Sequence, residues 1–213
     1  MSRRLVGVVF LVFTIGSWGC ATRPQAPPVM VPPQIDLRSH ETIGIIEFST
    51  TSKGQLGPLT TRRFTEAARR DQGLVRIMDL GSQRAALRSV GRDLLDADAL
   101  IAIGRKAGVK TIVTGELTIS KVRPDVRIDS LLRSGAVTAN VEAALDVQIF
   151  EVESGAALWN RSARTTHSVG QVQISGGTQF AFDAKNPDEA YGGLVDDLVA
   201  QVSQPFQVSW VRR

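Results

Sequence analysis

The sequence predicts an α/β (α+β) protein with a single mixed β-sheet packed with helices, and three observations lead to this fold class. An apolar, β-branched run from Thr42 to Ser49 is typical of a central strand covered on both faces. After this strand and up to Val122, segments whose apolar residues have a helical spacing are interspersed with segments typical of strands. Beyond that point, strict alternation of apolar and polar residues predicts a long antiparallel hairpin.

The first strand, Thr42 to Ser49, carries Ile43, Ile45, Ile46 and Phe48. The segment from Pro58 to Gln72 then places apolar residues at near-helical spacing, and Gly73 ends this helix. A short apolar run from Leu74 to Leu80 follows and predicts the second strand.

Capping residues predict the next two helices. Ser82 is suited to begin a helix that runs to about Val90. Either Asp96 or Asp98 is suited to begin the following one, which carries an apolar stripe and stops at Gly108.

The remaining strands are predicted from their alternation. Val109 to Val122 forms a third strand, in which Gly115 marks a bulge. Val137 to Ile149 gives the clearest period-two pattern, with one buried and one largely polar face. After turn residues at Glu153–Gly155, Ala157 to Val169 returns as its hairpin partner.

The irregular segments are the natural candidates for docking surfaces, because binding residues often lie on loops. They are a loop from Arg123 to Gly135 and a polar stretch from Gly170 to Asn186. A closing helix opens at Asn186 and ends near Pro205, and Phe206 to Val211 forms a last short strand.

Residues 1–19 have the layout of a bacterial signal peptide. Two arginines precede an apolar run from Leu5 to Ile15, which is shorter than the roughly 20 residues that a permanent membrane helix needs. Ser17, Trp18, Gly19 and Cys20 then resemble the lipobox of lipoproteins, in which signal peptidase cuts before a cysteine that receives lipid. Gly19 and Cys20 match that pattern, whereas Ser17 and Trp18 depart from its usual residues. The alternative is an ordinary secretory leader that happens to contain a cysteine.

Lipidation at Cys20 implies a membrane-anchored protein facing the periplasm. Several acyl chains together hold a protein stably on a bilayer. Ala21 stands where the family's inner-membrane retention signal has an acidic residue, which implies transfer to the outer membrane. The proline-rich residues 20–40 are predicted to be an extended tether. Residues 41–213 are then the periplasmic domain.

The charge of the chain argues against one class of function, nucleic-acid binding. Removing Arg3 and Arg4 with the leader leaves 23 basic residues against 21 acidic ones, a net charge of +2 in place of +4. This balance does not favour nucleic-acid binding, and the arginines at 62, 63, 69 and 70 fit the solvated face of a helix.

The sequence also predicts no catalytic, cofactor or metal site, and we expect a protein that is not an enzyme. His40 and His167 lack neighbouring ligands at metal-binding spacing. The adjacent Asp196 and Asp197 point in different directions on a helix, and Gly104 and Gly108 fit packing and helix termination rather than phosphate binding.

Three phrases resemble a known family of α/β domains. They are the opening strand Ile43–Phe48, the segment Ala107–Leu117 and the turn Val152–Trp159. This chain is similar here to the domain shared by the curli-secretion channel lipoprotein, the lipoprotein activator of penicillin-binding proteins and the amino-terminal domain of TolB. The resemblance implies a TolB-like fold and a role in cell-wall synthesis or secretion.

Three functions remain open at the level of sequence. The favoured one is a non-enzymatic binding and assembly module for an envelope protein. The second is a homo-oligomeric secretion-channel subunit that contributes hairpins to a membrane-crossing wall, although Arg161 and Arg164 place a charge on each face of the second hairpin strand. The third is an envelope enzyme whose site has no recognisable motif.

Overall fold

The computed structural model describes residues 27–125, 138–175 and 179–211. The strands are β1 Val29–Val31, β2 Thr42–Glu47, β3 Ser49–Thr50, β4 Lys53–Gly54, β5 Arg76–Ser82, β6 Thr111–Asp125, β7 Thr138–Glu151, β8 Ala157–Val169, β9 Gln173–Ser175, β10 Gln179–Phe182 and β11 Ser209–Val211. The helices are α1 Leu56–Arg69, α2 Gln83–Ser89, α3 Ala97–Ala107 and α4 Pro187–Ser203, with 3₁₀ turns η1 Leu37–His40 and η2 Gln204–Phe206.

The main sheet confirms the predicted mixed sheet, but it is not single, because the described residues also form the small sheets β1-β11 and β4-β10-β9. Its strand order is β5-β2-β6-β7-β8, and the short β3 also pairs with β6. The first three strands run parallel and β6, β7 and β8 run antiparallel. Strand β2 is an interior strand between β5 and β6 and has four consecutive buried residues, as its apolar run predicted.

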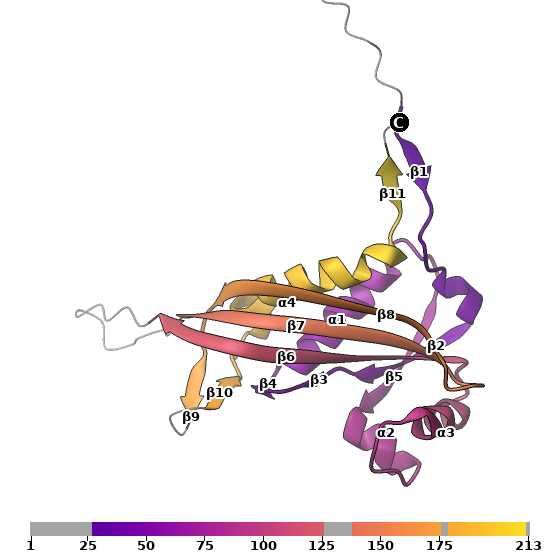
Figure 1. Cartoon of the computed structure of the whole chain (residues 1–213), viewed down its shortest axis with the longest axis horizontal. Coiled ribbons are helices and arrows are strands. Elements are labelled where there is room, and N and C mark those ends of the chain that lie inside the picture. Colours follow the sequence, from indigo (N-terminus) through magenta and orange to yellow (C-terminus); the bar gives the residue numbers. More distant parts are fainter. Residues whose placement is uncertain (1–26, 126–137, 176–178, 212–213) are drawn as a thin grey trace, which may run out of the picture.

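Helices pack on both faces of this sheet (Figure 1). On one face, α1 and α4 pack along the strands and enclose the larger core, which includes Phe64, Tyr191 and Leu198. On the other face, α2 and α3 pack at the parallel end around Ile46 and Ile112. On that second face, the antiparallel strands β6, β7 and β8 carry side chains that are exposed or half-buried. We call this surface the outer face, and its residues are Glu116, Thr118, Glu142, Ala144, Asp146, Ser162, Arg164 and Thr166.

The long hairpin has the residues and the phase that the sequence predicted. In β7 the odd-numbered residues from Ala139 to Val147 are fully buried under the α4 side of the sheet. Strand β8 pairs with β7 from Ala139↔Val169 to Phe150↔Ala157. Its Trp159 packs edge-on against Phe206, with ring centroids 5.1 Å apart.

The predicted helix caps are also confirmed. The Ser82 hydroxyl accepts a hydrogen bond from Ala85 N at the start of α2. Asp96, rather than Asp98, begins α3, and its carboxylate accepts from Ala99 N at 2.8 Å. Gly108 ends α3 with a φ of 69°, which a glycine adopts without strain.

Three expectations about local structure need correction. Gly115 does not mark a bulge: its backbone lies under the ring of Phe48, and a Cβ there would come within 2.8 Å of that ring. Leu74 is fully exposed and precedes β5, which begins at Arg76 and is an edge strand. Helix α1 begins at Leu56, two residues before Pro58, and ends at Arg69.

Part of the expected tether packs with the domain. Leu37 is 3% exposed and belongs to the larger core. Further out, β1 pairs with β11, so that the predicted last strand joins residues of the proline-rich segment in a separate two-stranded sheet. Ile35 and Leu37 therefore pack with the core that residues further along the chain form.

Candidate functional site

The predicted lipidation site lies outside the described residues. This holds for Cys20 and for the recognition residues Ser17, Trp18 and Gly19. Of the loop from Arg123 to Gly135, residues up to Asp125 continue β6 and the others also lie outside the described ranges. The polar stretch from Gly170 contains β9 and β10, which form one wall of a cleft.

This cleft, which we call the bulge cleft, has a volume of about 520 Å³ and lies where three separate segments meet. The segments are the β3–β4 connection, the middle of β6, and the β9–β10 hairpin. Its lining residues are Thr51, Ser52, Lys53, Ile119, Ser120, Lys121, Val122, Gln173, Phe180, Ala181 and Phe182.

A β-bulge at Ser120 shapes the floor of the cleft. Ile119 pairs with Ala143 and Lys121 pairs with Glu142, which leaves Ser120 as the extra residue. Its hydroxyl donates to the Glu142 carbonyl at 3.0 Å, and Lys121 Nζ lies 3.3 Å from the Glu142 carboxylate. Bulges re-aim side chains and occur often beside functional sites.

The β3–β4 connection is fixed against β6 by hydrogen bonds. Thr51 N donates to the Leu117 carbonyl at 3.2 Å, and Ile119 N donates to the Thr51 hydroxyl at 3.0 Å. Next along the chain, Gly54 has a φ of 112°, and a Cβ there would come within 2.1 Å of the Phe182 carbonyl oxygen. Only glycine allows this close approach of β4 to β10.

Tyr191 of α4 holds the segment that contains β9 and β10. Its buried hydroxyl donates to the Gln171 carbonyl at 3.2 Å and accepts from Ala184 N at 3.1 Å. Burial raises the pKa of the Tyr191 phenol, so the group stays protonated and keeps its donor. This wall is therefore attached to the main core and is not a free loop.

The chemistry of the cleft suits binding. Lys53 and Lys121 supply two exposed cations, the three hydroxyls and Gln173 supply neutral donors and acceptors, and Phe180 supplies an apolar surface. Such a set can hold carboxylates and a peptide backbone. No histidine, cysteine or acidic residue lines the cleft among the described residues.

Both histidines have structural partners elsewhere. His167 Nδ1 lies 3.0 Å from the Asp197 carboxylate and links β8 to α4. His40 Nδ1 lies 3.0 Å from the Thr111 hydroxyl. Within residues 27–125, 138–175 and 179–211, there is no cluster of three groups that could hold a metal ion.

Two of the arginines predicted to lie on the solvated face of α1 also form ion pairs with α4. Arg62 and Arg63 both donate to the Asp188 carboxylate of α4, at 2.6 and 2.8 Å. Arg63 Nε also lies 3.6 Å from Asp196, which leaves Asp196 and Asp197 with different partners. Arg62 and Arg63 therefore join two helices, while the other two predicted surface arginines, at 69 and 70, are exposed.

Comparisons with known proteins found similar solved structures at low sequence identity. No family model matches the chain, and no curated protein matches it. The PelC dodecamer from Paraburkholderia phytofirmans is 12% identical over 84% of this chain and 96% of its own, with a TM-score of 0.44. The LpoB C-terminal domain from Escherichia coli is 14% identical over 60% of this chain and 84% of its own, with a TM-score of 0.36.

A third solved structure, the lipoprotein GNA1162 from Neisseria meningitidis, is 13% identical over 76% of this chain and 97% of its own, with a TM-score of 0.36. Lipoproteins are thus among the structural neighbours, as the sequence resemblance predicted. Identities of 12–14% and TM-scores below 0.5 do not transfer any function to this chain.

Sequence reasoning missed the bulge cleft, although one signal for it was present. The inward-facing residues of β6 are Val113, Leu117 and Ile119, all odd-numbered, and the next is Val122. A change of phase by one residue within a strand indicates a bulge.

Among the helices of the described residues, none is both long and apolar enough to cross a membrane.

Proposed function

We propose that this protein is a lipoprotein anchored to the outer membrane through Cys20, and that its periplasmic domain is a non-enzymatic module that docks an envelope protein. The observation that carries the docking role is the bulge cleft, because three segments and a specific glycine build it and two lysines line it. The chemistry of its lining favours a polypeptide segment that carries carboxylates. The sequence resemblance favours a partner in cell-wall synthesis or secretion.

The anchor and the docking site have separate tests. Metabolic labelling with palmitate should mark the wild-type chain and should leave Cys20→Ala unlabelled. If the wild type is not labelled and is processed as an ordinary secreted protein, the lipid anchor is contradicted. The proposed docking role would not be affected by that result.

The docking test is a pull-down from crosslinked envelopes with the double variant Lys53→Glu, Lys121→Glu. Reversing both charges should strongly reduce recovery of the partner, because a negative side chain would replace each lysine and would repel the carboxylates of the partner. The matched control is Arg84→Glu, Arg88→Glu on α2, which reverses two exposed cations away from the cleft. Equal recovery from both double variants would show that the partner binds elsewhere.

A further inference from the structure

Strands β1 and β11 form a small ribbon that stands away from the rest of the domain (Figure 1). They pair antiparallel, with Val29 opposite Val211 and Met30 opposite Trp210. The apolar side chains of this ribbon are exposed: Val29 49%, Met30 55%, Val31 38%, Trp210 64% and Val211 48%. Five exposed apolar residues therefore gather on six residues of strand.

A free ribbon of this kind, with its apolar side chains in contact with water, is not expected to be stable by itself. An isolated pair of short strands is marginally stable, and clustered apolar side chains normally mark a surface that another phase or molecule covers. The ribbon must nevertheless be held at its base, because both of its strands connect to ordered parts of the domain.

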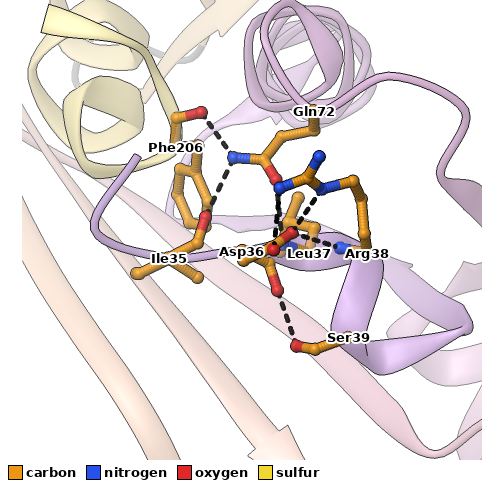
Figure 2. Close-up of polar contacts among 7 residues, drawn as sticks. All are labelled: Ile35, Asp36, Leu37, Arg38, Ser39, Gln72 and Phe206. Carbon is orange, nitrogen blue, oxygen red and sulfur yellow. Dashed lines mark hydrogen bonds and ion pairs between the residues drawn. The ribbon is translucent and has the colours of Figure 1, made fainter. Parts of the chain in front are cut away.

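A buried glutamine holds that base (Figure 2). Gln72 is 1% exposed, and its Oε1 accepts from Leu37 N at 2.9 Å. Its Nε2 donates to the carbonyls of Ile35 and Phe206, at 2.9 and 2.6 Å. Two further bonds support this arrangement, from Ile35 N to the Pro205 carbonyl and from Val208 N to Asp71.

The chain places the ribbon close to the predicted lipid anchor. Eight residues separate Cys20 from Val29. A fully extended segment of that length spans at most about 30 Å, so the ribbon cannot lie far from a bilayer that holds Cys20.

The residues that flank the ribbon in the sequence have a charge that suits an anionic surface. Residues 21–35 and 204–213 contain three arginines, Arg23, Arg212 and Arg213, and no acidic residue. The two acidic residues at the base are engaged: Asp36 pairs with Arg38 at 2.8 Å, and Asp71 accepts from Val208 N. Tryptophan and basic residues are the groups that proteins place at the membrane–water interface.

We infer that the β1–β11 ribbon inserts its apolar side chains into the headgroup region of an anionic phospholipid bilayer and so orients the domain on the membrane. This inference rests on the proposed anchor at Cys20, which brings the ribbon to the bilayer. The ribbon leaves the domain on the α4 side, whereas β4, β9 and β10 lie at the opposite side (Figure 1). The bulge cleft would then face away from the membrane, where a soluble partner can reach it.

The test uses the mature chain without lipid, residues 21–213, which contain every described residue. Trp159→Phe leaves Trp210 as its single tryptophan. We expect Trp210 emission to shift to the blue, and the protein to sediment, with vesicles of phosphatidylethanolamine and phosphatidylglycerol. Vesicles of phosphatidylcholine alone should have a weaker effect, because they carry no net charge to attract the arginines.

The variant Val29→Ser, Val211→Ser should lower the vesicle partition coefficient about tenfold or more, since both side chains leave water on insertion. The control is Leu74→Ser, Leu94→Ser, which removes two side chains that are more exposed, 104% and 75%, but lie outside the ribbon. The control should partition like the parent chain.

Two results would overturn the inference. One is an unchanged Trp210 emission with either kind of vesicle. The other is a dimer in light scattering without vesicles that the Val29→Ser, Val211→Ser variant abolishes, which would show that a second copy covers the ribbon. Because the tested chain carries no lipid, a failure of vesicle binding leaves the palmitate test of Cys20 unaffected. Conversely, a wild type that is not labelled at Cys20 but still binds vesicles would refute the anchor alone.

Discussion

At the scale of single residues, Gln72 joins three segments that are far apart in the sequence. Its amide satisfies one backbone N–H and two backbone carbonyls in a buried place. A buried polar group left without its partner costs about 1–3 kcal/mol. The residue therefore determines whether the amino- and carboxyl-terminal segments pack together.

We expect Gln72→Leu to lower the free energy of unfolding by roughly 3 kcal/mol or more, because all three partners lose their hydrogen bonds. Urea denaturation measures this as a lower midpoint. The control is Gln201→Leu in α4, where the amide is exposed and donates only to the Asp197 carbonyl, and a change within about 0.5 kcal/mol is expected. Equal midpoints for the two variants would refute the role of Gln72.

Single glycines show how far residue-level prediction reaches. Gly108 was predicted correctly, because a helix stop followed by a positive φ has a local sequence signature. Gly115 was interpreted wrongly as a bulge, since the ring that requires its missing Cβ belongs to Phe48 on another strand. Local sequence does not reveal which distant side chain will occupy that space.

At the scale of elements, the contact between α1 and α4 carries a pH dependence. Hydrogen bonding from Arg62 holds the pKa of the Asp188 carboxyl below its usual value of 3.8. A carboxyl whose folded pKa is depressed stabilises the fold above its unfolded pKa, and this contribution disappears as the pH falls through the folded value.

Asp188→Asn should therefore lower stability at neutral pH and should flatten its decline as the pH falls toward and below 3.8. Urea midpoints of the wild type and the variant at neutral and acid pH measure the difference. Asp93→Asn, an exposed change in the loop before α3, should reproduce the wild-type decline. Parallel curves for Asp188→Asn and the wild type would contradict the assignment.

At the scale of the whole molecule, the burial of the hairpin favours one of two hypotheses for the function. It favours the docking module over the channel subunit. One face of β7 and β8 packs under α4, where Leu194 and Leu198 are fully buried. The other is the polar outer face, on which Arg164 is exposed. Moving these strands into lipid would uncover the core and would place an arginine there at a cost of roughly 2–4 kcal/mol.

We therefore expect the mature chain without lipid to stay in solution without detergent and to run as a monomer on an unheated denaturing gel. Light scattering of the same sample gives its mass in the native state. Heat-resistant and detergent-resistant rings would support the channel subunit instead, and would require α4 to leave the hairpin.

The sequence by itself determined the elements whose patterns are local. The alternation in residues 137–169 fixed the hairpin and its buried face, and Ser82, Asp96 and Gly108 fixed helix ends, because period and capping depend on neighbours a few residues away. The lipid anchor at Cys20 also comes from the sequence alone and stays a prediction. Only the tertiary structure decided the bulge cleft, the Gln72 contacts and the ribbon. Each joins segments that are far apart in the sequence, 182 residues in the case of Val29 and Val211, and packing of the whole chain determines which such segments meet.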